Sequence, residues 1–365
     1  MNIGFDAKRI FHNKTGLGAY SSSLAHHLVK LYPQHTFYFY TPSFTRSDAF
    51  DFFENQENVV IRTLPRPSWF WRSIMLSFFV RRDKLDVFHG LSGELPLISF
   101  RPKIKTIVTI HDVIFKSHPQ YYEYWDRMIY HLKTKRSLSL ANKIVAVSRF
   151  TKSEIVKNYE TTAPIDVISP VLKSVYLYRS KHLKESEFKS LYNLRNGFFL
   201  YVGSFNKRKN IEIVIKALSN LPDKKKKKLV IVSNDSAGSV LNTARAYGVE
   251  DWVRIEKDVD DKTLSLYYSF CTAVIYPSFI EGFGLPILEG IVHGAKVICS
   301  SLPVHKEAGG ELPIFFDPYN SDELTDILSS LSFYERKGDK VALSHLNTFS
   351  PTLICGELMR LYAQK

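Results

Sequence analysis

Short apolar runs typical of β-strands alternate along this chain with longer amphipathic runs typical of helices. Strands are predicted at residues 2–6, 36–40, 58–64, 86–89, 105–110 and 143–147, and helices at residues 17–31, 67–82 and 121–140. Strands that alternate with helices favour a parallel sheet with helices on both faces. The first part of the chain is therefore predicted to form one α/β domain.

A polar, charged stretch at residues 171–196 interrupts the alternation, which then restarts. Further strands are predicted at residues 198–202, 228–233, 252–256, 272–276, 296–300 and 313–316, and helices at 211–219, 237–247, 262–270, 287–293 and 323–331. Because single cores stop growing at ~250–300 residues, a chain of 365 residues suits two domains. We predict two facing, Rossmann-like doubly wound domains, residues 1–172 and 173–348, with a deep ligand cleft between them, followed by a C-terminal helix within residues 349–365.

The charge balance leaves the class of partner open. A net charge of +13, from 49 basic and 36 acidic residues, suits nucleic acid, an anionic membrane surface or a polyphosphate ligand. The basic run at residues 224–228 has no interleaved aromatic residues, so we interpret it as a solvated loop. The three cysteines lie in apolar runs and are predicted to be reduced thiols. The start of the sequence does not resemble a leader peptide and no apolar run reaches ~18 residues, so a cytoplasmic location is predicted.

The most specific motif runs from Glu281 to Gly290, after the predicted strand 272–276. Its glycines let the loop backbone approach a ligand closely, and the amide groups at the following helix start favour a phosphate. Glu281, in the loop, and Glu289, predicted in the first helical turn, can accept hydrogen bonds from sugar or ribose hydroxyl groups. A helix start with a favourable acidic turn is the alternative. The other loop residues assigned to ligand binding are Gly282, Phe283, Gly284 and Leu285.

A second motif, at residues 203–210, follows the first strand of the second domain. Arg208 and Lys209 place cations where a departing diphosphate would build up negative charge, and fixed cations there would lower the barrier. Ser204 in the same loop is also assigned to ligand binding. A solvated basic turn is the alternative.

Two weaker signals lie in the first domain. Gly16 and Gly18 fit a loop that passes close to a pyrophosphate or a sugar, although Ser21 stands at the third glycine position of a dinucleotide fingerprint. An ordinary tight turn explains them equally well. His111, after the predicted strand 105–110, can donate a hydrogen bond to a sugar hydroxyl group, and Asp112 can orient its ring or cap a turn. A structural histidine is the alternative.

Asp258 and Asp260 resemble an Asp-x-Asp metal motif. However, Asp260 precedes the predicted helix 262–270, so we interpret it as an N-cap. No metal site is predicted.

Together these motifs resemble glycosyltransferase family 4, whose members have the GT-B fold. The resemblance spans nearly the whole chain, in order: residues 15–20, 111–112, 147–152, 203–210, the glutamates at 281 and 289, 304–310 and 316–318. It is strongest to bacterial mannosyltransferase-like enzymes of lipopolysaccharide or capsule synthesis. One departure is Ser204, where some relatives carry a second arginine, so the diphosphate would rest more heavily on Arg208 and Lys209.

The resemblance implies a retaining hexosyltransferase that needs no metal or other cofactor. It would move a mannose-like hexose from a GDP- or UDP-linked sugar to a glycan or lipid-linked glycan acceptor. The implied contacts are the donor hexose for Glu281, the ribose for Glu289, the diphosphate for Arg208 and Lys209, the sugar for His111, and the base for the backbone near Asp258 and Val259. The last helix would cross back onto the first domain.

Other functions stay open. A sugar-nucleotide epimerase or another enzyme of the same fold is the first alternative. A nucleic-acid-binding protein is the second, but only the net charge suggests it, because no nucleic-acid recognition module is visible. The aromatic and basic stretch at residues 69–82 could touch an anionic surface at the inner face of the plasma membrane, although a packed helix is the favoured interpretation.

Overall fold

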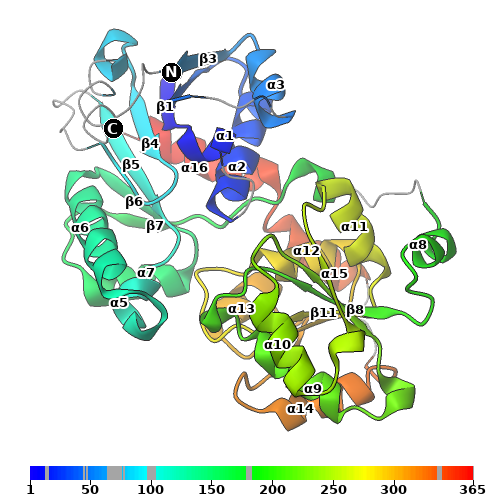
Figure 1. The fold of residues 1–365 in the computed structure, drawn as a ribbon. Helices are drawn as coiled ribbons and strands as arrows, with labels where there is room; N and C mark the ends of the chain where they lie inside the picture. The colour runs from blue at the N-terminus through cyan, green and yellow to red at the C-terminus, as the bar shows by residue number, and fades with distance from the viewer. Residues whose placement is uncertain are drawn as a thin grey trace. The chain divides into compact units, whose positions relative to one another are not determined.

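The computed structural model describes residues 1–12, 16–43, 46, 48–63, 76, 79–96, 104–177, 183–334 and 339–364. The chain divides into two compact units, residues 1–173 with 349–365, and residues 174–348 (Figure 1). This division lies one residue from the predicted boundary at 172/173. Most of the predicted helix 67–82 lies outside the described residues.

The first unit is built on a parallel sheet of seven described strands in the order β3-β2-β1-β4-β5-β6-β7. The strands are β1 Asn2–Asp6, β2 Thr36–Thr41, β3 Val59–Thr63, β4 Val87–Gly90, β5 Lys105–Ile110, β6 Lys143–Ala146 and β7 Ile165–Val167. In the register, Ile3 of β1 lies opposite both Phe37 and Val87. The central strands are apolar and buried because helices cover both faces of the sheet. The sequence analysis missed β7, which has only three residues.

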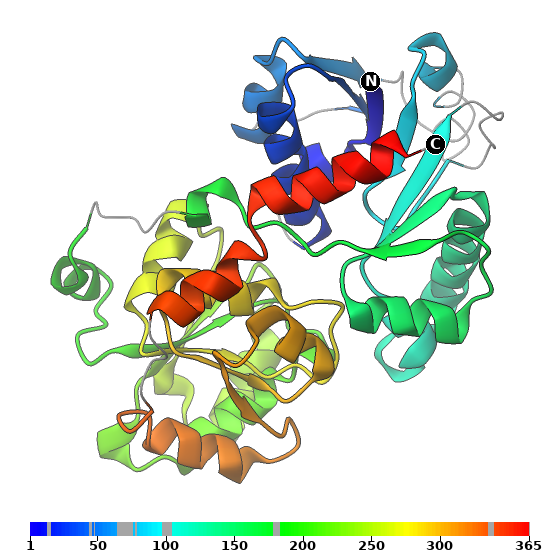
Figure 2. The ribbon, with the colours of Figure 1, turned by 180° about the vertical axis from the view of Figure 1, so that it is seen from behind.

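The described helices of the first unit include the C-terminal helix. They are α1 Lys8–His12, α2 Leu17–Leu31, α3 Asp48–Glu54, α5 Ile114–Ser117, α6 Tyr124–Leu140, α7 Arg149–Asn158 and α16 Pro351–Ala363. Helix α16 packs against α2 (Figure 2). At its end, the Tyr362 hydroxyl lies 2.7 Å from Nδ1 of the buried His89, and Lys105 Nζ donates to the Leu361 carbonyl at 2.6 Å. These contacts attach the last helix to the first unit.

The second unit contains a parallel sheet of six described strands in the order β10-β9-β8-β11-β12-β13. The strands are β8 Phe198–Val202, β9 Lys228–Val232, β10 Val253–Glu256, β11 Ala273–Tyr276, β12 Val297–Ser300 and β13 Ile314–Phe316. The helices are α8 Glu185–Leu191, α9 Ile211–Asn220, α10 Gly238–Ala246, α11 Asp261–Phe270, α12 Leu285–His293, α13 Pro303–Gly309, α14 Ser321–Ser329 and α15 Asp339–Asn347. The core of this unit lies between the sheet and α9, α10 and α14.

Helix α8 lies within the polar stretch 171–196, where the sequence analysis predicted no helix. Its single buried apolar residue, Phe188, packs against Phe198 and Tyr267. One apolar position in a charged helix gives almost no periodic pattern, so the sequence analysis did not detect it.

The three cysteines are free thiols. Within the described residues, none of the helices combines the length and the apolar character that crossing a bilayer requires.

Candidate functional site

The predicted motifs of the second unit meet at one edge of its sheet. Strands β8, β11 and β12 are neighbours, so the loops at residues 203–210, 277–284 and 301–302 leave the sheet side by side. The carboxyl-terminal edge of a parallel sheet is where ligands bind in doubly wound folds.

Asn210 connects two of these loops. Its backbone takes the left-handed conformation, with φ 53°, and its buried side-chain amide donates to the carbonyl oxygens of Pro277 and Pro318 at 3.1 and 2.8 Å. The Asn206 side chain caps the short 3-10 turn Lys207–Lys209 by accepting from the Arg208 amide at 3.1 Å. Asn210 is the last residue of the motif 203–210, and the motif by itself predicted no role for it. The structure shows that it fixes the cations next to the glutamate loop.

Arg208, Lys209 and Glu281 form an ion-pair cluster. Arg208 Nη1 donates to Glu281 Oε2 at 2.8 Å and to the Ile280 carbonyl at 3.1 Å. Lys209 Nζ lies 2.6 Å from Glu281 Oε1 and donates to the Tyr276 hydroxyl at 2.9 Å. The two strongest motifs of the sequence are therefore in direct contact.

The electrostatics of the cluster keep Glu281 ionised. The residue is only 6% exposed, and burial raises the pKa of its carboxyl group. The charges of Lys209 and Arg208 outweigh burial, so the pKa ends well below its usual range. A buried carboxylate of this kind depends on both cations, because losing one would leave charge poorly compensated.

Helix α12 begins directly after this loop. Gly284 has φ 123°, a conformation that side-chain-bearing residues rarely adopt, and Pro286 occupies the second helical position. Gly294 ends the helix in a left-handed conformation. A Cβ at Gly290 would lie 2.7 Å from a Val297 methyl group, so this glycine lets the helix pack closely on β12.

The prediction that Glu289 lies in the first turn of the helix is wrong. The helix begins at Leu285, two residues earlier than expected, which moves Glu289 to the second turn. There the buried Tyr268 hydroxyl donates to Glu289 Oε2 at 2.6 Å. Sequence reasoning missed Tyr268 because it lies on α11, 21 residues away.

The loop after β10 carries the predicted base-binding backbone. Asp258 has a left-handed φ of 51° and its amide donates to Asn234 Oδ1 at 2.9 Å, while Val259 is partly exposed. Asp260 is the predicted N-cap of α11, accepting from the Thr263 amide at 2.8 Å. The loop after β8 is joined to the same region, since the Phe205 amide donates to Asp235 Oδ2 at 2.7 Å. No group of side chains suited to hold a metal ion occurs among the described residues.

His305, on α13, is a buried member of this sheet edge that the sequence analysis did not single out. Its Nδ1–H donates to the Ser300 carbonyl at 2.9 Å, and its ring lies 5.2 Å from that of Tyr276. Burial lowers its pKa from 6.5 to about 4. Its Nε2 has no hydrogen-bond partner within the described part of the chain.

In the first unit, His111 follows β5 as predicted. Its Nε2–H donates to the Leu91 carbonyl at 2.8 Å, and its ring meets Tyr20 edge-on with centroids 4.5 Å apart. Burial lowers its pKa, so the ring is neutral near pH 7 and Nδ1 is its acceptor nitrogen. Asp112 caps a turn, because its Oδ1 accepts from the Ile114 amide at 3.2 Å.

The predicted glycine loop of the first unit stands at the start of α2. Gly16 takes the N-cap position with φ 49°, a conformation that favours glycine, and a Cβ there would meet no atom within 4 Å. Gly18 is buried in the first turn. Thr15 lies outside the described residues. In the second unit, Ser204 is partly buried, and its carbonyl accepts from the Tyr201 hydroxyl at 2.8 Å.

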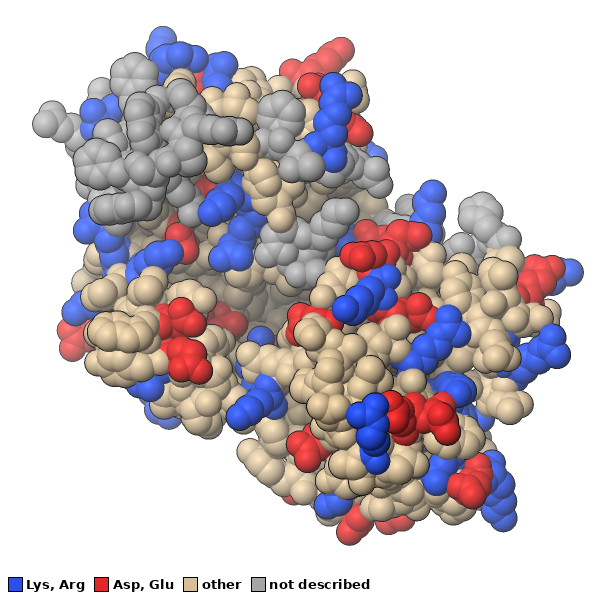
Figure 3. Space-filling view, viewed as in Figure 1, with Lys and Arg blue, Asp and Glu red and all other residues tan. Residues whose placement is uncertain are grey.

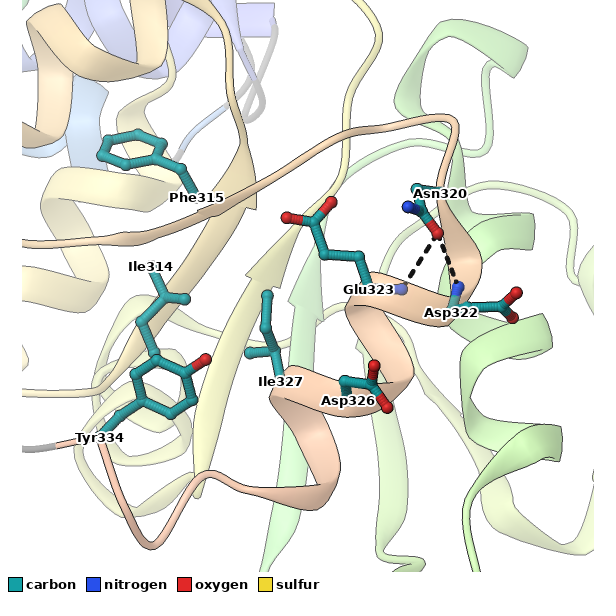
Figure 4. A pocket seen from close by; sticks show the side chains of 8 residues that line it. All are labelled: Ile314, Phe315, Asn320, Asp322, Glu323, Asp326, Ile327 and Tyr334. Carbon is teal, nitrogen blue, oxygen red and sulfur yellow. Dashed lines mark hydrogen bonds between the residues drawn. The ribbon is translucent and has the colours of Figure 1, made fainter.

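A shallow pocket of about 570 Å³ lies elsewhere on the second unit (Figure 4). It is lined by α14 and β13, and the acidic side chains of Asp322, Glu323 and Asp326 stand around it. Two of the α14 amides that could face a ligand donate to Asn320 Oδ1 at 3.1 Å. None of the predicted site residues lines this pocket, and its negative charge opposes a phosphate.

Two family models match the chain and cover most of it. Residues 15–172 match "Glycosyltransferase Family 4", and residues 184–337 match "Glycosyl transferases group 1". The chain is 31% identical to the O-antigen chain mannosyltransferase B of Escherichia coli over 258 residues, which are 68% of this chain and 66% of that protein. It is 26% identical to the O-antigen chain mannosyltransferase RfbU of Salmonella typhimurium, over 64% of this chain and 65% of that protein. The matches thus span slightly less than two thirds of these relatives.

Solved structures share the fold over the full chain length. The Anabaena protein HepE in complex with UDP-glucose has a TM-score of 0.77 at 16% identity, covering 99% of both chains. WaaG, described as a glycosyltransferase involved in lipopolysaccharide biosynthesis, has a TM-score of 0.74 at 14% identity, covering 100% of both chains. The predicted GT-B fold with two Rossmann-like domains is confirmed, and the chain belongs to glycosyltransferase family 4.

Proposed function

We propose that the protein is a retaining glycosyltransferase that uses a nucleoside-diphosphate sugar as its donor. The observation that carries the proposal is the cluster of Arg208, Lys209 and Glu281 at the carboxyl-terminal edge of the second sheet. Two fixed cations suit a diphosphate, and a buried, ionised carboxylate suits the hydroxyl groups of a hexose.

The cluster suggests how a donor would bind. The diphosphate would compete with the Glu281 carboxylate for the two cations, and Glu281 would then accept hydrogen bonds from the donor hexose. Transfer breaks the bond between the anomeric carbon and the diphosphate oxygen and forms a bond from that carbon to an acceptor hydroxyl oxygen. The hydroxyl proton leaves with the diphosphate, whose growing negative charge Arg208 and Lys209 stabilise.

The other assignments follow the same donor. Glu289 would bind the ribose, and the backbone near Val259 would bind the base. His111 would meet a sugar hydroxyl group, and because its Nε2–H is already used, its Nδ1 would accept the hydrogen bond. No metal ion is required in this proposal, since Arg208 and Lys209 supply the positive charge.

The donor sugar is proposed to be mannose, linked to GDP, and the acceptor a glycan or a lipid-linked glycan. The O-antigen mannosyltransferases among the relatives support the sugar, and the UDP-glucose complex of a structural neighbour supports a nucleotide-linked donor of this kind. A lipid-linked acceptor would bring the protein to the inner face of the plasma membrane.

A thermal-shift panel of GDP, UDP, ADP and CMP, each with and without magnesium, tests the donor site. A nucleotide at ~100 times its Kd adds ~2.7 kcal/mol of stability, which corresponds to several degrees in Tm. We expect GDP to give the largest shift, with no change on adding magnesium. If none of the four nucleotides raises the Tm, the proposed donor site is wrong.

Product analysis with the selected sugar nucleotide tests the reaction. We expect the hexose to be transferred to an acceptor with its anomeric configuration unchanged. A hexose that stays on the nucleotide but changes configuration would instead identify an epimerase.

A further inference from the structure

Helix α6 exposes most of its large apolar side chains, and two of its three buried residues are polar, which departs from the usual pattern of a surface helix. The exposed fractions are 59% for Tyr124, 75% for Trp125, 40% for Met128, 49% for Ile129 and 60% for Leu132. The buried residues of the helix are Thr134, Ser137 and Leu138. Packing within the first unit therefore does not explain why these exposed positions of α6 are apolar.

These five side chains lie along one side of the helix, whereas a sixth exposed apolar side chain, Tyr130, is 41% exposed and lies on the opposite side. At about 100° per residue, the five fall within an arc of about 140°, and we call them the α6 stripe. Lys135 and Arg136, both exposed, fall within the same arc one turn further on. The stripe is thus an aromatic and aliphatic surface that ends in two cations.

The contacts of α6 with the rest of the unit come from the opposite side. Tyr130 meets the rings of Phe115 and Tyr122, with centroids 5.8 and 6.1 Å away, and His131 Nδ1 lies 3.1 Å from the Tyr159 hydroxyl. Figures 1 and 2 both show α6 at the periphery of the first unit. In Figure 3 the surface over α6 is mostly tan, with charged side chains at its margins.

We infer that the α6 stripe docks onto the surface of an anionic lipid bilayer. Tyrosine and tryptophan suit the boundary between headgroups and acyl chains, and aliphatic side chains beside them enter that boundary. Residues 123–140 carry four basic and two acidic side chains, and the whole chain carries a net charge of +13, so an anionic surface is the complementary one.

Lys135 favours a bilayer over a protein partner. Lysine is depleted in protein–protein interfaces, whereas lysine beside apolar side chains is typical of helices that lie in a membrane interface. Lys116 on α5 adds to this positive charge. It lies near α6, because burial and the charges of Lys116 and Lys135 together lower the pKa of His131. The inference is independent of the proposed reaction, because vesicle binding is measured without donor or acceptor.

The test is co-sedimentation of the full chain with vesicles of phosphatidylcholine containing about one third phosphatidylglycerol, at low salt. The variant carries Trp125→Ser, Ile129→Ser and Leu132→Ser. Its matched control carries Leu191→Ser, Val341→Ser and Leu343→Ser, which are 73%, 51% and 58% exposed on helices of the second unit. We expect the α6 variant to bind at least about tenfold more weakly and the control to bind like the wild type. Both should keep the wild-type Tm, because all six side chains are exposed.

A second variant tests the charge. Lys135→Glu with Arg136→Glu should weaken binding several-fold on anionic vesicles and leave binding to pure phosphatidylcholine unchanged. The inference is wrong if the wild type does not bind anionic vesicles, or if the α6 variant binds them as tightly as the wild type. If the wild type does not bind vesicles but forms a dimer that the α6 substitutions dissociate, the stripe instead binds a second copy of the protein.

Discussion

The two sheets of the molecule carry different chemistry at their carboxyl-terminal edges. In the second unit, Glu281 is held between Arg208 and Lys209 by ion pairs of 2.8 and 2.6 Å. In the first unit, His111 is neutral and its Nε2–H is bound by a backbone carbonyl. The second edge can exchange one anion for another, whereas the first offers hydrogen bonds to uncharged groups. In the proposed function, the second edge therefore binds the charged diphosphate together with the hydroxyl groups whose hydrogen bonds Glu281 and Glu289 accept, whereas the first edge meets uncharged hydroxyl groups only.

Removing the carboxylate should produce the largest effect. We expect Glu281→Gln to lower the free energy of unfolding by about 4 kcal/mol, because two partly buried cations lose their counter-charge. Urea denaturation measures the loss. Glu250→Gln, which breaks an exposed pair with Arg245, is the control and should lose little or no stability. A nucleoside diphosphate should also stabilise Glu281→Gln more than the wild type. Equal losses in the two variants would show that the cluster contributes no more than a surface pair.

Acidification should weaken the second unit through His305. The unfolded imidazole takes up a proton as the pH falls through 6.5, but the folded one stays neutral until about pH 4. Stability present above pH 6.5 is therefore lost between pH 6.5 and 4, by up to about 3 kcal/mol. Urea denaturation across this window should show a smaller loss for His305→Gln than for the wild type. Parallel losses would rule out His305 as the source.

Removing one cation of the cluster should lower the rate more than removing His111 of the first unit does. We expect Arg208→Ala to lower kcat by ~10²-fold or more, the scale for removing one group that stabilises developing charge. Lys207→Ala, at the exposed neighbouring position, should leave the rate unchanged. A kcat/KM within about threefold of the wild type would exclude Arg208 from the proposed role.

A change at the first edge should leave charge recognition intact. His111→Ala should lower kcat/KM about tenfold, the scale of one hydrogen bond, and the Tm increase caused by GDP should not change. This combination distinguishes the two edges in one variant. If the GDP response disappears with His111, the division of roles between the units fails.

The smallest effect should come from the residue that positions Glu289. Tyr268→Phe removes a 2.6 Å hydrogen bond to Glu289, and we expect donor binding to weaken by about 1 kcal/mol, seen as a several-fold higher KM with little change in kcat. Tyr267→Phe is the matched control, because that tyrosine donates to Glu256 instead, at 3.2 Å. An equal rise in KM for both variants would contradict a positioning role for Tyr268.

The sequence determined the features that depend on local order along the chain. The alternation of apolar and amphipathic runs predicted two parallel α/β domains, and the N-cap at Asp260 followed from residue type and position. The motif residues were identified for the same reason, since glycines, cations and glutamates stand at the ends of predicted strands. The elements that the sequence analysis did not predict include β7, with three residues, and the helices α3, α7, α8, α13 and α15.

The tertiary structure alone decided which of these residues meet and in what state. Glu281 lies 73 residues from Arg208, and Tyr268 lies 21 residues from Glu289, so neither contact leaves a pattern in the sequence. The low pKa of His305, the proton position on His111 and the exposure of the α6 stripe depend on what packs around each group. Burial and electrostatic environment are properties of the folded surroundings, and the sequence records the residues without recording those surroundings.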